Sequence, residues 1–550
     1  MDNQRLILLL VFFFSCMMLW DAWQRKDLPP PGQQTAMTQA ATPSGAAGTA
    51  SGDASVPPAP ISRSAAGTPV VPGTQQTAQQ AAASGSVMTV ATDLVVADIS
   101  AQGGDLVRLE LLRHQATEKS DQKFVLLDRT HAYAAQSGLI GAGLPNHKTV
   151  WSLPAEQLAL KDGDGENELR VALEAPIEGG GKVVKTYVFK RGSYLVDVEH
   201  QVIGASPAGA HAYFQLTRDD KPPEGANAMM MTFTGAAVFT DQDKFKKVDF
   251  SDFGGKNKHP LNADNGWVAM VQHYFVSAWL PTAGEREYFT RALGGNLFAI
   301  GLVMPFPSDG GKLNVPLYAG PQEQDKLQQI APGLDLVVDY GWLTFIAAPL
   351  FWVLSWIHDY VGNWGWAIIL LTVLIKAVFF PLSAASYKSM AKMRVLTPKL
   401  MKLKEAYADD RVRMNQEMME LYKKEKVNPL GGCLPILVQI PVFIALYWVL
   451  LGTVEMRGAP WLGWITDLSK MDPYYVLPII MGVTMFVQTR LNPTPPDPIQ
   501  AKIMLWMPVI FTFMFLWFPS GLVLYWIVNN VLSIAQQWQC NRMIEAGGGK

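Results

Sequence analysis

Cysteine is scarce in this chain of 550 residues, and the long stretch between Val87 and Asp339 has none. The three cysteines, Cys16, Cys433 and Cys540, all lie in or beside apolar segments. A disulfide framework is therefore not expected, and no pair of cysteines has the spacing of a zinc site. We predict a protein without a bound metal.

Sequence motifs of enzymes are also missing. The chain contains no nucleotide-binding P-loop, no Gly-x-Ser-x-Gly elbow and no HExxH pair. The histidines show no paired spacing that would suit a metal. They are His114, His131, His147, His200, His211, His259, His273 and His358. We therefore predict that the protein is not an enzyme, that it uses no cofactor, and that it is not a primary pump.

The amino terminus resembles a secretory signal, with Arg5 before the apolar run Leu6–Trp20. No small-x-small cleavage site follows this run, and the polar sequence after Trp23 begins instead. A lipoprotein site at Cys16 is the alternative, but the bulky side chains before that cysteine fit it poorly. We predict an uncleaved signal anchor over residues 1–23.

The next part of the chain divides into a tether and a β-rich domain. Residues 24–86 are mostly Pro, Gly, Ala, Ser, Thr and Gln, which bury too little apolar surface to offset the entropy of ordering, so they predict a disordered tether. From Val87 to residue 338, short runs alternate between apolar and polar residues and are separated by turn residues. This period of two predicts a large antiparallel β-sandwich. The clearest strands are residues 95–100, 106–112, 183–189, 194–199 and 297–303.

Beyond residue 338 the chain is dominated by long apolar runs. The first run, residues 339–361, is aromatic and contains Pro349, and we expect an amphipathic helix that lies in the membrane interface. Five further runs predict membrane spans, which together with the amino-terminal anchor make six. They cover residues 362–381, 434–451, 475–488, 503–518 and 522–537.

Basic residues gather in the segment 383–428, which the positive-inside rule places in the cytoplasm. Counting spans from this segment puts both termini, including the short tail 538–550, in the cytoplasm and the β-domain outside. Apolar residues at a spacing of three to four predict a helical hairpin in this segment. The two helices could pack against each other as a hairpin, and the same hairpin could also offer a docking surface for a cytosolic partner. Direct nucleic-acid specificity is not expected, because acidic residues alternate with the basic ones.

A single charged residue, Lys376, lies within the span 362–381. A lysine in hydrocarbon costs roughly 3 kcal/mol, so a chain that keeps it usually uses it. The alternative is that its aliphatic stem lets the ammonium reach the nearer interface. Short, proline-containing spans with polar residues favour a water-accessible interior, although the polar groups could simply join helices, above all Asn529 and Asn530. The recurring polar residues are Thr372, Gln439, Thr512, Asn529, Asn530 and Ser533.

Several longer motifs resemble the YidC membrane-protein insertases of Gram-negative bacteria. In the membrane part they are Lys388-Ser-Met-Ala-Lys-Met-Arg394, Lys426-Val-Asn-Pro-Leu-Gly-Gly-Cys433, Asp472-Pro-Tyr-Tyr475, Met481-Gly-Val-Thr-Met-Phe486 and Trp517-Phe-Pro-Ser-Gly-Leu-Val-Leu-Tyr525. The outer part adds Asn265-Gly-Trp-Val-Ala-Met270 and Val338-Asp-Tyr-Gly-Trp342. The resemblance in layout extends over essentially the whole chain.

This resemblance implies a polytopic α-helical membrane protein of the bacterial inner membrane. It implies a five-helix insertase core over residues 362–537, a large periplasmic antiparallel β-super-sandwich domain and an added first span. A hydrophilic groove would open to the cytoplasm and the lipid, with Lys376 at the position of the family's basic residue. That residue is more commonly arginine, so lysine keeps the charge but loses the planar fork of donors. The other residues that would contact a client are Thr372, Gln439, Tyr525 and Trp526.

The function implied by the resemblance is that of a membrane protein insertase and chaperone, which acts alone or with the Sec translocon and consumes no ATP. Expected partners are nascent membrane-protein clients, the Sec translocon with its accessory subunits, and the lipid bilayer. A targeting receptor or a ribosome would contact the cytoplasmic hairpin. The residues alone leave two other classes open, namely a transporter and an envelope scaffold with a carbohydrate-binding outer domain. A transporter is less favoured, because the spans show no clear internal repeat.

Overall fold

The structure is a computed structural model that describes residues 55–58, 85–116, 122–160, 167–222, 233–253, 262–407, 410–425, 434–491 and 498–547. The chain divides into two compact units. Among the described residues, one unit extends up to Val338 and the other begins at Asp339. The predicted signal anchor lies outside the described residues, and so does most of the predicted tether.

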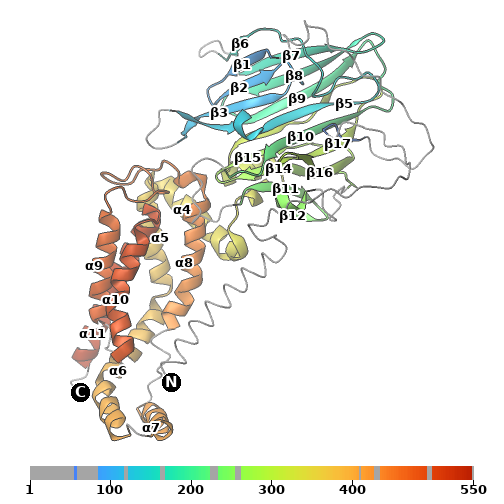
Figure 1. The fold of residues 1–550 in the computed structure, drawn as a ribbon. Helices are drawn as coiled ribbons and strands as arrows, with labels where there is room; N and C mark the ends of the chain where they lie inside the picture. Colours follow the sequence, from blue (N-terminus) through green and yellow to red (C-terminus); the bar gives the residue numbers. More distant parts are fainter. Residues whose placement is uncertain are drawn as a thin grey trace, which may run out of the picture. The chain divides into compact units, whose positions relative to one another are not determined.

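The larger of the two sheets in the β-unit is mainly antiparallel and has β10 near its centre (Figure 1). Its strand order is β13 (Asn262–Ala263), β16 (Arg286–Gly294), β17 (Leu297–Pro305), β10 (His211–Asp219), β5 (Ala134–Ile140), β3 (Leu106–Gln115), β2 (Val95–Ser100), β1 (Val87–Ala91) and β6 (Gln157–Ala159). β4 (Lys123–Leu127) pairs with β3, and β6 pairs with β1 in parallel.

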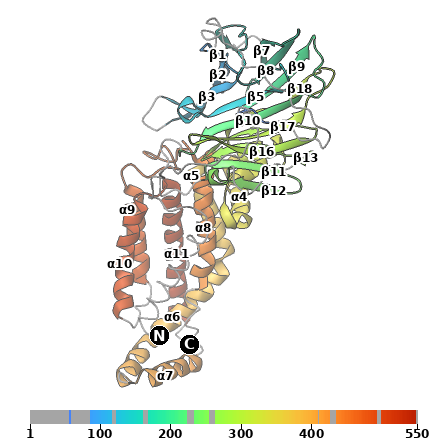
Figure 2. The same ribbon diagram turned by 45° about the vertical axis from the view of Figure 1, so that its right-hand side comes forward.

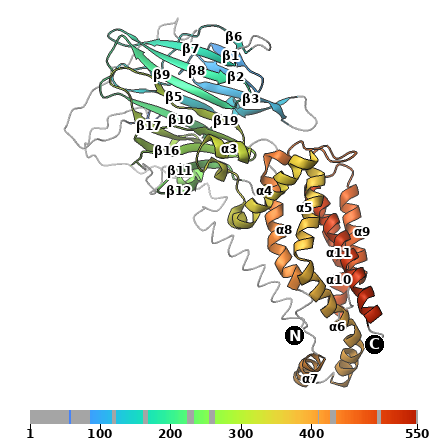
Figure 3. The same ribbon diagram turned by 180° about the vertical axis from the view of Figure 1, so that it is seen from behind.

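The smaller sheet is assembled from two groups of strands that are distant in sequence. Its order is β12 (Lys244–Val248), β11 (Gly235–Thr240), β14 (Trp267–Gln272), β15 (Phe275–Trp279), β19 (Leu317–Pro321), β9 (Leu195–Ile203), β8 (Lys182–Lys190) and β7 (Glu168–Pro176), with β18 (Leu313–Asn314) beside β9. β19, the last strand among the described residues, therefore lies between β15 and β9. The short helix α3 (Gln324–Ile330) follows β19 in the sequence and lies near it in Figure 3.

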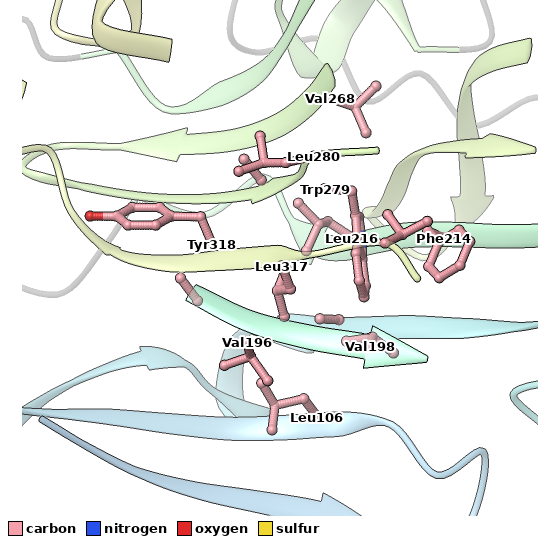
Figure 4. Packing of buried hydrophobic residues seen from close by; sticks show 14 of the residues in the cluster. Leu106, Val196, Val198, Phe214, Leu216, Val268, Trp279, Leu280, Leu317 and Tyr318 are labelled. Atoms are coloured by element: carbon pink, nitrogen blue, oxygen red, sulfur yellow. The ribbon is translucent and has the colours of Figure 1, made fainter. Parts of the chain in front are cut away.

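The two sheets pack face to face around an apolar core, which confirms the predicted β-sandwich. In β9 every second residue is buried, as a strand with one face on a core requires. Figure 4 shows Phe214 and Leu216 of β10 near Trp279 of β15, with Leu317 of β19 over β9, where it is paired with Val196. β10, β11, β14 and β15 are buried on both faces, so they do not alternate in exposure.

A charged pair is buried inside this sandwich. The ammonium of Lys185, on β8, donates to the carbonyl oxygens of Gly103, Gly104 and Ser137 at 2.8, 3.1 and 2.9 Å. Its distance to a carboxylate oxygen of Asp105 is 3.5 Å. Burial lowers the pKa of Lys185 to about 8 and raises the pKa of Asp105 to about 7, and the attraction between the two opposes both shifts. The pair joins β8 to the loop before β3.

The second unit is helical, as predicted for the carboxy-terminal part of the chain. Figures 1 and 2 show α5, α8, α9, α10 and α11 side by side in a bundle, with α6 and α7 at one end of it. The helices are α4 (Thr344–Val361), α5 (Trp364–Val378), α6 (Phe380–Ala406), α7 (Arg411–Lys424), α8 (Leu434–Gly452), α9 (Val476–Leu491), α10 (Pro498–Phe515) and α11 (Ser520–Gly547). Short 3-10 helices occur at Arg129–His131, Phe250–Asp252, Leu334–Val337, Gly341–Leu343 and Val454–Met456.

The motif that starts at Asp472 fixes the beginning of α9. The buried carboxylate of Asp472 accepts hydrogen bonds from the backbone N–H groups of Tyr474 and Leu477 at 3.0 and 2.7 Å. It also accepts one from the indole of Trp464 at 2.9 Å. An acidic side chain before a helix satisfies backbone donors that have no partner within the helix. The motif therefore has a structural role in this chain.

Helix length alone identifies few membrane spans among the described residues. One helix, Gly341–Val361, is long and apolar enough to cross a bilayer, and a second candidate exists only if Trp364–Val378 and Phe380–Met390 count together across a 65° bend. Shorter apolar helices cover Val438–Gly452, Val476–Leu491 and Ala501–Phe515. The count of six spans and the interfacial position of residues 339–361 stay predictions.

Candidate functional site

Lys376 lies in the last turn of α5, where the sequence bends the chain. The side chain of Asn363 caps the start of this helix by accepting a hydrogen bond from the N–H of Trp366 at 3.2 Å. Pro381 has no N–H, so it is tolerated in the first turn of α6 but not in the interior of a continuous helix. The 65° bend between α5 and α6 follows, and it leaves Lys376 beside the carbonyl end of α5, which favours a cation.

The ammonium of Lys376 is bound by a hydroxyl group of α11. Lys376 is only 8% exposed, and its Nζ donates to Oγ of Ser533 at 2.8 Å. The Ser533 hydroxyl in turn donates to the carbonyl oxygen of Asn529, one helical turn earlier, at 2.7 Å. Tyr387 of α6 contacts the same region, with its hydroxyl 3.5 Å from the carbonyl oxygen of Ser533. Within the described part of the chain, no acidic side chain pairs with this lysine.

A small hollow that is open on one side lies beside Lys376. Residues of α5, α6 and α8, together with Phe379 between α5 and α6, form its lining. They are Ile375, Lys376, Phe379, Leu382, Ser383, Val438, Gln439 and Val442. The amide of Gln439 donates to the side-chain oxygen of Asn529 on α11. The hollow is therefore mostly apolar, with an ammonium, a hydroxyl and an amide in its wall.

The structure brings two of the five predicted client-contacting residues, Lys376 and Gln439, to this hollow. Thr372 is buried, and its hydroxyl donates to the carbonyl oxygen of Ile368 in the same helix at 2.7 Å. Tyr525 and Trp526 pack instead against the ring of Phe443 on α8, with centroid distances of 6.2 and 4.7 Å. These three residues are not among those that line the hollow.

The direct partner of Lys376 was not identified from the sequence. Ser533 was recognised only as one of several polar residues in a span, because it is 157 positions from Lys376. A signal was nevertheless present in α11. Asn529, Ser533 and Gln537 follow one another at a spacing of four, which places them on one face of the helix, and all three are buried. A buried polar stripe of this kind predicts a polar partner on a neighbouring helix.

We also searched the described residues for a cluster of side chains that could bind a metal ion. Among them, no group of three or more His, Cys, Asp and Glu side chains could hold a metal ion. The arrangement at Lys376 can bind an anionic group through the ammonium and can offer hydrogen bonds from Gln439 and Ser383.

Comparisons with known proteins cover nearly the whole chain. A family model described as the YidC periplasmic domain matches residues 87–353, and one described as the 60Kd inner membrane protein matches residues 356–547. The membrane protein insertase YidC of Aromatoleum aromaticum is 60% identical over 99% of this chain and 98% of that protein. The protein of the same name from Dechloromonas aromatica is 58% identical over 100% and 98% of the two chains. A crystal structure described as an active YidC insertase with its first transmembrane domain resolved is 19% identical, with coverage of 81% and 90% and a TM-score of 0.39.

Proposed function

The chain belongs to the YidC family of membrane protein insertases, and on this premise we propose that it inserts and folds integral proteins of the inner membrane. The β-sandwich is the periplasmic domain of that family, and the helical unit is its inner-membrane part. The observation that carries the proposed mechanism is the buried ammonium of Lys376 beside an open hollow, bound by a hydroxyl group.

In this proposal, the positive charge of Lys376 attracts the acidic, hydrophilic tail of a client. Its ammonium has three N–H donors, and Ser533 is its hydrogen-bond acceptor in the described part of the chain. A client carboxylate 4 Å from Nζ would gain about 4 kcal/mol at an effective dielectric constant of about 20. The tail would stay in the hollow only briefly, while the apolar segment of the client moves into the lipid. No bond is made or broken, so the proposal needs no enzyme activity and no cofactor.

The proposed topology has six spans, with both termini in the cytoplasm. The basic residues of α6 and α7 support a cytoplasmic position of the hairpin. α5 and α9 contain 15 and 16 residues. At about 1.5 Å per residue these helices are shorter than the ~30 Å hydrocarbon core. Short helices thin the bilayer locally, which would shorten the path of a client tail.

The proposed protein partners are nascent clients, the Sec translocon with its accessory subunits, and a targeting receptor or ribosome at the hairpin. An exposed ion pair at 2.7 Å joins Lys399 of α6 to Glu425, which follows α7. Met401, Val412 and Met419 are exposed on it. Exposed methionines suit adaptable apolar contacts, which supports a docking role for this surface.

Photocrosslinking to a stalled nascent client tests the proposed path. A photoreactive residue at Ile375, Val438 or Val442, all in the lining of the hollow, is expected to crosslink to the hydrophilic tail of the client. The matched control is Val483, which is 59% exposed on α9 and does not line the hollow. Crosslinks that are absent from the three lining positions, or equally strong at Val483, would contradict the proposal.

Ser533→Ala is expected to slow the insertion of clients with acidic tails by at least about tenfold. The change removes the hydroxyl that binds Lys376 Nζ, and a hydrogen bond to a charged group contributes roughly 1.5–3 kcal/mol. Ser533→Thr keeps a hydroxyl and should insert normally. The measurement is the insertion rate in proteoliposomes, for the same client with an acidic or a neutral tail.

Thr489→Ala is the matched control for this prediction. The Thr489 hydroxyl also bonds to a carbonyl of its own helix, at 2.8 Å, but it contacts no lysine in the described part of the chain. It should leave the rate unchanged. The positioning role of Ser533 is wrong if Ser533→Ala inserts both clients at the normal rate, or if Ser533→Thr is as slow as Ser533→Ala.

A further inference from the structure

The outer face of the larger sheet carries an apolar cluster that faces away from the core of the sandwich. Phe214 and Leu216 of β10 point into the core, so the alternating residues Tyr213 and Gln215 lie on the opposite face. Tyr213 is joined there by Phe289 of β16 and Val303 of β17. Their exposed fractions are 0%, 8% and 3%. An outer sheet face that is buried must be covered by another segment.

A segment that precedes the β-domain in the sequence covers part of this outer face. Val56, in the stretch predicted as a tether, packs against the cluster of Tyr213, Phe289 and Val303. Pro57 is buried, and Pro58 is exposed. We refer to Ser55–Pro58 as the docked segment. It lies about 30 residues before the first strand of the domain that it contacts.

Polar side chains of the sheet bind the backbone of the docked segment. The amide of Gln215 donates to the carbonyl oxygen of Ser55 at 3.3 Å. The guanidinium of Arg291 donates to the carbonyl oxygen of Val56 at 2.9 Å. These two contacts bind successive carbonyl groups, so the sheet holds the segment by its main chain. The side-chain oxygen of Gln215 has no donor among the described residues, although Gln215 is fully buried.

A histidine adds a contact to the serine of the docked segment. Nε2 of His147 lies 3.1 Å from Oγ of Ser55, and Nδ1 bonds to the hydroxyl of Tyr213. Burial, together with the charge of Lys185, lowers the pKa of His147 to about 4, so the ring is neutral at pH 7. One ring nitrogen of a neutral histidine donates and the other accepts, and either tautomer satisfies both hydroxyl groups.

Two glycines leave the room that the cluster needs. A Cβ atom on Gly138 would lie 2.8 Å from the hydroxyl of Tyr213 on the neighbouring strand. A Cβ atom on Gly301 would lie 2.6 Å from the ring of Phe289 and 2.8 Å from Cβ of Gln215. Larger residues at these positions would displace the side chains that hold the docked segment. The site is thus built into the strands and does not depend on flexible surface side chains.

We propose that this face is a binding site for a short, proline-containing peptide, and that Ser55–Pro58 is its resident ligand. The chemistry of the ligand follows from the contacts. A small polar residue meets His147, a β-branched residue fills the apolar cluster, and two prolines follow. Proline has no N–H group, so a buried Pro57 leaves no backbone donor without a partner. The site fixes the tether to the periplasmic domain, a role separate from the hollow at Lys376.

A competition experiment on the full-length chain in detergent micelles tests this site. The probe is a fluorescent peptide with the sequence of residues 54–61, Ala-Ser-Val-Pro-Pro-Ala-Pro-Ile. Val56→Asp is expected to release the docked segment, so the peptide should bind this variant at least tenfold more tightly than the unchanged chain. Adding Arg291→Met should weaken peptide binding at least tenfold. The matched control adds Arg170→Met, at an exposed position of β7, to the Val56→Asp chain. This change should leave peptide binding unchanged.

The specificity of binding is measured with a peptide that has aspartate in place of its valine, which should not bind. Equal binding of both peptides, or no binding to the Val56→Asp chain, overturns the proposal. A second measurement needs no peptide. With p-benzoylphenylalanine in place of Val56, the full-length chain should form internal crosslinks to β10, β16 or β17. Their absence also overturns the proposal.

Discussion

Clients with acidic translocated tails are expected to remain uninserted when Lys376 is replaced by glutamate. An attraction of about 4 kcal/mol between Nζ and a client carboxylate becomes a repulsion of similar size. Because about 1.4 kcal/mol corresponds to a factor of ten, the insertion rate should fall by more than about 100-fold. Lys376→Arg keeps the charge and should insert such clients. The measurement is the protease protection of a client in vesicles that contain the variant as their sole insertase.

Two controls separate the charge of the hollow from a general effect. Lys402→Glu makes the same change in net charge at an exposed position of α6 and should insert clients normally. A client with a neutral tail should be affected far less by Lys376→Glu than a client with an acidic tail. Normal insertion of acidic-tailed clients by both Lys376→Ala and Lys376→Glu would refute an electrostatic role of this lysine.

Lys185→Met is expected to destabilise the β-sandwich by about 3–5 kcal/mol. The substitution removes the ammonium that satisfies three buried carbonyl oxygens, and it leaves the carboxyl of Asp105 without its cation. Breaking a buried ion pair by removing one partner typically costs this amount, because the other group stays buried without compensation. Lys182→Met, on the same strand, removes an exposed ion pair with Glu174 and should cost less than about 1 kcal/mol.

The scarcity of cysteine allows this stability to be measured within the full-length chain. After the three natural cysteines are replaced, Ala278→Cys on β15 provides a single thiol at a fully buried position. Its labelling rate in increasing urea reports the unfolding of the sandwich. The transition should move to lower urea for Lys185→Met and stay near the parent value for Lys182→Met. Equal shifts for the two variants would show that the buried pair is no more important than the exposed one.

Strands with one exposed face were predictable from the sequence, whereas most strands buried on both faces were not; β17, predicted from the run 297–303, is an exception. The predicted strand at residues 95–100 coincides with β2, and the one at 183–189 lies within β8, because both alternate between apolar and polar residues. β14, Trp267–Gln272, is buried throughout and gives no such alternation. In β10, the outer residues are also buried, in part by the docked segment. A local pattern carries no information on a cover that comes from a distant part of the chain.

The central residues of the candidate site were predictable from the sequence, but the hydrogen bonds and packing contacts between them and other helices were not. Lys376 was identifiable because a charge in an apolar run is costly, and Gln439 because an amide in a span is unusual. The bond to Ser533 depends on how α5 packs against α11, which no local pattern specifies. Tyr525 and Trp526, expected at the hollow from the family resemblance, pack in an aromatic cluster with Phe443.

The position of β19 in the smaller sheet has a consequence for the time at which the periplasmic domain can fold. β19 pairs with both β9 and β15, and Leu317 lies about 120 residues after its partner Val196. At roughly 5–20 residues per second, the ribosome needs on the order of ten seconds to make this stretch. Throughout that interval β9 has an unpaired edge, which invites pairing with other chains. The domain of an insertase that serves other newly made proteins is thus itself exposed to misassembly during its own synthesis.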